Sequence, residues 1–72
     1  MDVRRKIGGR IKGLRNKANI SQMELALLAD LDRTYITSVE NGKRNISIVN
    51  IEKIANALNI TLKDFFNDAR FS

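Results

Sequence analysis

The 72-residue sequence contains no cysteine, no histidine and no proline. Without cysteine there is no disulfide and no thiolate metal site, and without histidine the commonest metal ligand and general base is missing. There is also no phosphate-binding glycine loop and no pair of carboxylates with a pocket to occupy. We therefore predict no metal and no cofactor, and an enzyme is the least favoured class.

Long apolar runs are missing as well. No segment approaches the ~20 apolar residues of a membrane span, and the charged first residues are not followed by the apolar run of a secretory signal. We expect a cytoplasmic protein made of a single domain over residues 1–72. Because so small a core supplies only about 3–5 kcal/mol, and disulfides and metals are excluded, oligomerisation remains as a source of stability.

The charge is unevenly distributed along the chain. The net charge is +5, but residues 1–17 carry about +6 and the rest about −1, because seven basic residues precede position 18. Such a segment suits a polyanion such as nucleic acid. A solvated helix face explains the charge equally well, and a membrane surface explains it less well because the segment has no Trp or Phe.

Apolar residues recur with helical spacing, which predicts an all-α fold of five short helices. We expect them at about 4–18, 22–29 and 33–40, with a fourth that starts after Ser47 and a fifth that starts after Thr61, followed by a loose tail at 68–72. Ser21 and Glu24 form a capping box, Thr61 and Asp64 a similar pair, and Asp32 and Ser47 are N-caps. The predicted core residues are Ile7, Ile11, Leu14, Ala18, Leu25, Ala26, Ala29, Ile36, Val39, Ile48, Ile51, Ile54, Ala55, Leu58, Leu62 and Phe65, with Leu28 at the margin of the core.

Residues 22–40 have the layout of a helix-turn-helix, with a three-residue turn and a polar second helix. The major groove of DNA admits one helix, and an arginine at its start, here Arg33, can contact a guanine. Thr34, Thr37 and Ser38 can reach bases or phosphates, and Tyr35 can stack or bind a phosphate. A polar face in an ordinary helical bundle is the alternative.

The motifs SQMELA (21–26), YITSVENG (35–42) and IANAL (54–58) resemble the lambda-repressor-like helix-turn-helix family, also called the xenobiotic-response-element family. The resemblance covers about residues 5–67. Within it, LDRTYI (31–36) and RNIS (44–47) are similar to controller proteins of type II restriction–modification systems. The resemblance implies a dimeric transcriptional regulator that binds a pseudo-palindromic operator and controls its own gene and that of an endonuclease.

The resemblance also implies roles for particular residues. Recognition helix 33–40 would present Arg33, Thr34, Tyr35, Thr37 and Ser38 to the groove, and Gln22 would bind a phosphate and brace this helix. Phosphate contacts beyond the helix would come from Asn41, Lys43, Arg44 and Asn45, although Lys43 is equally well explained as a solvated lysine. Arg15 and Glu40 would form a structural ion pair.

The sequence departs from the family pattern at three positions. Glycine is often found where this chain has Asn19 and Asp30, and both residues tolerate the left-handed conformation that these turns need. Position 23 is often polar, but here it is methionine. Met23 and Leu27 are the candidate partner-binding residues on that helix.

Ile46, Val49 and Phe66 remain once the core positions are assigned, and they predict a dimer interface within residues 46–67. Completion of the monomer core by Ile46 and Phe66 is the alternative. The resemblance implies dimerisation through this region and half-sites about one DNA turn apart. Because the chain ends soon after the fifth helix, we expect no ligand-sensing domain and no small-molecule ligand.

Three other functions stay open. A phage-type repressor is a sibling hypothesis, as is the antitoxin of a toxin–antitoxin pair. An antitoxin would need a surface for its toxin, and residues 23–27 or the tail are the candidates. A protein-interaction module that does not read DNA belongs to a different class, and it would more often carry apolar residues on the 33–38 face. The expected partners are double-stranded DNA, a second copy of the chain and, for an activator, RNA polymerase. We expect localisation with the bacterial nucleoid.

Overall fold

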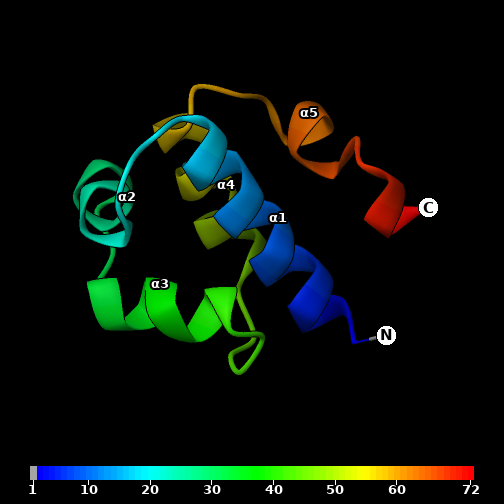
Figure 1. Cartoon of the computed structure of the whole chain (residues 1–72), viewed down its shortest axis with the longest axis horizontal. Coiled ribbons are helices and arrows are strands. Elements are labelled where there is room, and N and C mark those ends of the chain that lie inside the picture. The colour runs from blue at the N-terminus through cyan, green and yellow to red at the C-terminus, as the bar shows by residue number, and fades with distance from the viewer. Residues whose placement is uncertain (1) are drawn as a thin grey trace.

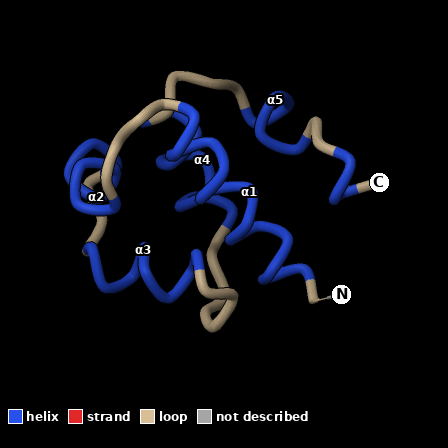
Figure 2. Tube along the Cα trace, in the orientation of Figure 1, coloured by secondary structure: helices blue, strands red, loops and turns tan. Residues whose placement is uncertain are grey.

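The computed structural model describes residues 2–72. Its elements are α1 (Val3–Lys17), α2 (Gln22–Ala29), α3 (Arg33–Glu40), α4 (Ile48–Ala57), α5 (Leu62–Phe66) and a short 3-10 turn, η1 (Ala69–Phe71). Within the described residues there is no strand, and Figure 2 shows helices joined by short loops. The predicted all-α fold of five helices is therefore confirmed.

The helix ends follow local sequence signals. The Ser21 hydroxyl accepts the Glu24 N–H and the Glu24 carboxylate accepts the Ser21 N–H, both at 3.0 Å, which closes the predicted capping box. Asn19 and Asp30 have φ values of 60° and 57°, so both take the expected left-handed conformation. Asn59, which the sequence analysis did not single out, ends the α4 turn in the same way, with φ 61°.

Two caps differ from expectation, and a third was not predicted. Asp32 precedes α3 but makes no side-chain cap hydrogen bond. Thr61 accepts the Asp64 N–H at 3.0 Å, but only this half of a capping-box arrangement is present. Asp2 caps α1 by accepting the Arg4 N–H at 2.8 Å, and hydrogen bonds from the Arg4 side chain and backbone lower the pKa of Asp2 to about 2.

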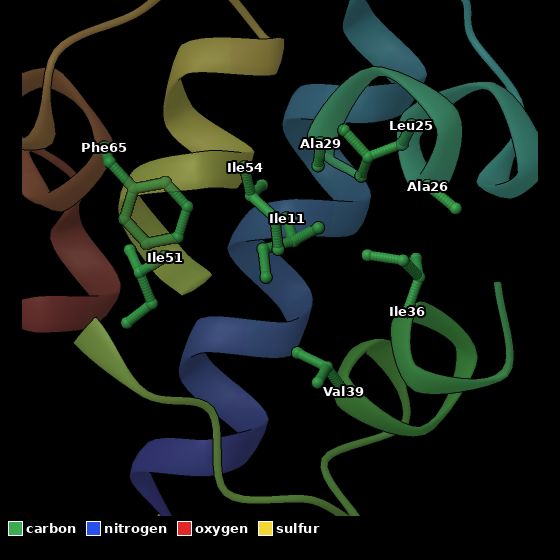
Figure 3. Packing of buried hydrophobic residues seen from close by; sticks show 9 residues of the cluster. All are labelled: Ile11, Leu25, Ala26, Ala29, Ile36, Val39, Ile51, Ile54 and Phe65. Carbon is green, nitrogen blue, oxygen red and sulfur yellow. The ribbon is translucent and has the colours of Figure 1, made fainter. Parts of the chain in front are cut away.

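The core lies where α1, α2, α3, α4 and α5 meet, and Figure 3 shows its buried side chains converging from all five helices. Ile11, Leu25, Ile36, Ile54 and Phe65 are fully buried. Gly8 allows α1 to approach α3 closely, because a Cβ there would lie 2.2 Å from the Val39 carbonyl oxygen. A glycine at this position within α1 is thus required by packing.

Two predicted core positions are wrong. Ala18 is the exposed C-cap of α1, and Ile48, the first residue of α4, is 60% exposed. Both lie at the end of a helix. The helical spacing of apolar residues continues there in the sequence, but no neighbouring helix covers the side chain. Ile7, Leu14, Leu58 and Leu62 pack against the core while remaining partly exposed.

The loose tail predicted at 68–72 is also wrong. Residues 69–71 form η1, and Phe71 packs against the core. Arg10 of α1 donates to the Phe65 and Asp64 carbonyl oxygens, each at 2.8 Å, and pairs with Asp68 at 3.3 Å. The Arg70 N–H donates to Asp68 and lowers the pKa of this carboxyl. Contacts with α1 order the tail, and contacts between residues so far apart cannot be predicted from the local sequence.

Across residues 2–72, no helix combines the length and the apolar character needed to cross a membrane. The same residues contain no group of acidic side chains arranged to hold a metal ion.

Candidate nucleic-acid interface

Helices α2 and α3 lie in succession at one end of the molecule, with α3 along an outer edge (Figure 1). Arg33 and Thr34, in the first turn of α3, are exposed, and together with Thr37 they line a surface groove. Ser38 is half-buried on the same helix. The structure thus brings these four predicted residues to one face, whose only charged member is Arg33.

A buried ion pair fixes α3 against α1. Arg15 donates from Nε to Glu40 Oε2 at 2.8 Å and from a terminal nitrogen to Glu40 Oε1 at 2.9 Å. The Glu40 side chain is 1% exposed and that of Arg15 is 11% exposed. Arg15 also donates to the Ile20 carbonyl oxygen at 3.0 Å, and its hydrogen bonds to Glu40 raise its own pKa. The ion pair implied by the resemblance is present.

Gln22 extends this pair into a network that joins three helices. Its amide nitrogen donates to Glu40 Oε1 at 3.1 Å, and its amide oxygen accepts from the Thr37 hydroxyl at 2.9 Å. The Thr37 hydroxyl lies equally within reach of the Arg33 carbonyl oxygen, at 3.1 Å, and its single proton serves one acceptor at a time. Gln22 therefore braces the recognition helix from the N-terminus of α2.

Tyr35 is held by contacts to α4 and to the turn that follows α3. Its ring packs against the core, and its hydroxyl accepts from the Asn50 side-chain amide at 3.0 Å. The Arg44 guanidinium lies over the ring, 5.0 Å from its centroid. Tyr35 is thus half-buried and lies beneath Arg44, and the role in the groove that the sequence predicts for it stays a prediction.

The turn after α3 carries the predicted phosphate-binding residues. The chain reverses at Gly42, whose φ is +71°, and the four predicted side chains around it are all exposed: Asn41, Lys43, Arg44 and Asn45. Their exposure beside the end of α3 leaves them accessible to a ligand that contacts this helix.

The basic segment is less available than its net charge indicates. Arg4 pairs with Asp2 at 2.6 Å, Arg10 with Asp68 and Arg15 with Glu40. Three of the seven basic residues before position 18 are therefore already neutralised within the chain. Counting charges along a sequence cannot separate such residues from free ones.

The predicted interface residues divide into two groups. Val49 is 59% exposed and Phe66 is 37% exposed, and the exposed Ile48 lies next to Val49 in sequence. Ile46 instead packs against the core, which is the alternative that the sequence left open. Phe66 packs against two other aromatic rings, because its ring centroid lies 5.0 Å from that of Phe65 and 5.2 Å from that of Phe71.

Helix α2 also exposes apolar side chains. Met23 is 56% exposed, Leu27 is 77% exposed and Leu28 is 63% exposed. Met23 and Leu27 are four residues apart and share one side of the helix. This pair is the surface that the sequence identified as a candidate for binding a partner protein.

Sequence reasoning missed two residues that organise this region. Asn50 holds the Tyr35 hydroxyl, and the available signal was a polar residue within the apolar start of α4. Arg10 holds α5 and the tail. No local signal separates Arg10 from its basic neighbours, because its partners lie more than fifty residues away.

Residues 11–65 match the family model described as helix-turn-helix. The chain is also similar to Control protein C.MunI of a Mycoplasma species, with 50% identity over 68 residues that cover 93% of this chain and 92% of the relative.

Two solved structures are similar over 92% of this chain. The restriction-modification controller protein C.AhdI of Aeromonas hydrophila is 44% identical, is covered completely, and has a TM-score of 0.87. The controller protein C.Esp1396I, solved as a tetramer with its natural 35 base-pair operator, is 33% identical, is 87% covered and has a TM-score of 0.86.

Proposed function

Because the chain belongs to the helix-turn-helix family, we propose that it is a sequence-specific DNA-binding transcriptional regulator and the controller protein of a type II restriction–modification system. It binds a pseudo-palindromic operator as a homodimer and regulates its own gene and that of an endonuclease. Similarity to control proteins over nearly the whole chain, in sequence and in fold, supports this role.

The observation that carries the proposal is the face of α3. Arg33 and Thr34 are exposed at its first turn, while Gln22 of α2 and Arg15 of α1 hold the helix through Thr37 and Glu40. A guanidinium at this position can donate two hydrogen bonds to O6 and N7 of a guanine in the major groove. Thr34 and Ser38 provide further hydrogen-bonding or methyl contacts, and the exposed residues after α3 bind phosphates.

Dimerisation is proposed through α4 and α5, within residues 46–67. Exposed apolar side chains of this kind are typical of interaction surfaces, and Val49, Ile48 and Phe66 are the candidates. Two recognition helices would then meet half-sites about one helical turn apart, ~34 Å. Dimer formation and operator occupancy would rise together with protein concentration.

The proposed regulator is not an enzyme and works with DNA in the bacterial cytoplasm, at the nucleoid. The residue types support this proposal, because the whole sequence lacks histidine and cysteine. The only buried carboxylate of the described residues, that of Glu40, is bound by Arg15 and Gln22. The candidate site is thus equipped for binding.

A second candidate function rests on the exposed Met23 and Leu27 of α2. An apolar surface beside a DNA-binding helix suits the antitoxin of a toxin–antitoxin pair, which must hold its toxin, or contact with RNA polymerase by an activator. The neighbouring genes discriminate: a methyltransferase and an endonuclease indicate a controller protein, and a toxin gene indicates an antitoxin.

Selection of bound sites from random duplex DNA, repeated at two salt concentrations, tests the proposal. We expect enrichment of one two-fold-symmetric site and an affinity that falls steeply with salt, because phosphate contacts release counterions. Salt-sensitive binding without any enriched site would reduce the protein to a nonspecific basic DNA binder.

A further inference from the structure

Four basic residues of α1 have no ion-pair partner among residues 2–72. They are Arg5, Lys6, Lys12 and Lys17. The first two are neighbours in sequence at the N-terminal end of the helix, and they make equal contributions to net charge. Their surroundings differ, and this difference indicates what each can bind.

Gly8 establishes the orientation of α1. A Cβ at Gly8 would lie 2.2 Å from the Val39 carbonyl oxygen, so this side of the helix faces α3. Each residue of an α-helix advances by about 100°. Arg5, three residues before Gly8, lies within about 60° of the direction of α3, whereas Lys6, two residues before it, points about 160° away.

Arg5 lies against the turn that follows α3. Its Cγ atom is 2.7 Å from the position of a Cβ built at Gly42, and its Cα is 3.2 Å away. Arg5 also lines a surface groove together with Gly9, Glu40 and Asn41. Figure 1 shows the beginning of α1 on the same side of the molecule as the loop after α3. The first turn of α1 therefore extends the surface that Asn41 and its neighbours form.

We infer that Arg5 binds a DNA phosphate beside Asn41, so that the first turn of α1 enlarges the phosphate-binding surface of each half-site. The inference rests on the proposed function and adds to it a contact from outside the helix-turn-helix. The ligand is a phosphate of the backbone, so Arg5 contributes affinity without base preference.

The chemistry of the groove leaves the Arg5 guanidinium free for this contact. The carboxylate that lines the groove, Glu40, is 1% exposed and already accepts hydrogen bonds from Arg15 and Gln22. The Arg5 side chain is exposed, and its stem packs on Gly42. A guanidinium can bind two oxygens of one phosphate in its planar geometry. Gly42 is needed twice, for its positive φ and for the close approach of this stem.

The test compares Arg5→Ala with Lys6→Ala. Both variants remove one positive charge from adjacent positions, so their effects on the long-range field are nearly equal, and only Arg5→Ala removes a proposed contact. Binding is measured on the selected operator and on random duplex DNA across a range of salt concentrations. We expect Arg5→Ala to reduce the slope of log K against log salt by about 1 on both DNAs, and Lys6→Ala to reduce it clearly less.

Equal slopes for the two variants would overturn the inference, and so would an Arg5→Ala slope identical to that of the wild type. If Arg5→Ala lowers the melting temperature, the salt slope of Arg5→Met is compared with that of Lys6→Ala instead, because methionine keeps an aliphatic stem over Gly42. The random-DNA measurement separates this test from the proposed function. If the wild type selects no operator, the proposed regulator role fails, while the comparison of Arg5 and Lys6 on random DNA still tests the contact.

Discussion

A network of side-chain hydrogen bonds links helices on the α2–α3 side of the molecule, whereas the α4–α5 side combines packed phenylalanine rings with the hydrogen bonds that Arg10 donates to α5. On the first side, Arg15, Glu40, Gln22 and Thr37 link three helices through hydrogen bonds of 2.8–3.1 Å. On the second, three phenylalanine rings lie with centroids 5.0–6.3 Å apart. Exposed apolar side chains occur on both sides, at Ile48 and Val49 of α4 and at Leu27 and Leu28 of α2.

The difference corresponds to what each side is proposed to do. Hydrogen bonds are directional, so the network fixes the angle at which α3 presents Arg33, and base contacts require such accuracy. Apolar association is non-directional and scales with buried area. Apolar association therefore suits the proposed dimer interface, whose formation depends on protein concentration.

The largest expected effect comes from breaking the polar side at its centre. Arg15→Ala leaves Glu40 buried and charged without its principal partner, and we expect a loss of about 3–5 kcal/mol in the free energy of unfolding. Denaturation with urea measures this loss. Lys12→Ala, which removes the same charge from an exposed position, is the matched control and should change stability by less than about 0.5 kcal/mol. Similar values for the two variants would contradict the structural role of the pair.

The next effect concerns the apolar side. Val49→Glu places one carboxylate from each protomer in the proposed interface, and an unsatisfied charged group costs more than about 1–3 kcal/mol. We expect monomers in sedimentation equilibrium at concentrations where the wild type is a dimer, and Phe66→Glu should act in the same way. Met23→Glu makes the same change on α2 and should leave the dimer intact. Dissociation caused by Met23→Glu alone would move the interface to α2.

A smaller effect is expected where the polar network presents its side chain to DNA. Arg33→Ala should cost about 1–3 kcal/mol on the selected operator and relax the preference at one base pair. Arg44→Ala removes the same charge from the turn, and it should weaken binding to all sequences and lower the salt slope by about 1. If Arg33→Ala weakened all sequences equally, Arg33 would contact only the backbone.

The smallest effect is the response of the tail to acid. The Arg70 N–H bond lowers the pKa of Asp68 below its ordinary value of 3.8. A lowered folded-state pKa stabilises the fold above the unfolded value, and the contribution is lost as pH falls from about 4 through the folded pKa. We expect amide signals of residues 69–71 to shift in this range. Asp68→Asn should abolish the response, and an unchanged response in this variant would assign it to another carboxylate.

The sequence was most informative where a structure depends on near neighbours. The Ser21–Glu24 capping box and the left-handed turns at Asn19 and Asp30 each involve residues within one turn of a helix, and all three predictions are confirmed. The buried positions of α2 were predicted correctly for the same reason. Helix ends were harder, since Ile48 continues the apolar stripe of α4 and yet faces solvent.

The candidate site was predicted from its pattern but not from its contacts. Resemblance to a family placed Arg15 opposite Glu40, and the residue types of 33–38 identified α3 as the helix with the polar face. The pattern did not indicate that Tyr35 is held by Asn50 and covered by Arg44. Nor did it separate Arg5, which lies on Gly42, from Lys6 beside it.

The sequence by itself determined the all-helical fold, the position of the two-helix motif and the excess of positive charge near the N-terminus, because periodicity, capping and composition are local properties. Only the tertiary structure decided which charges remain free for DNA. Arg10 and Arg15 find partners 55 and 25 residues away, and only folding brings such partners together. The same long-range packing orders the tail and lays the first turn of α1 beside the turn after α3.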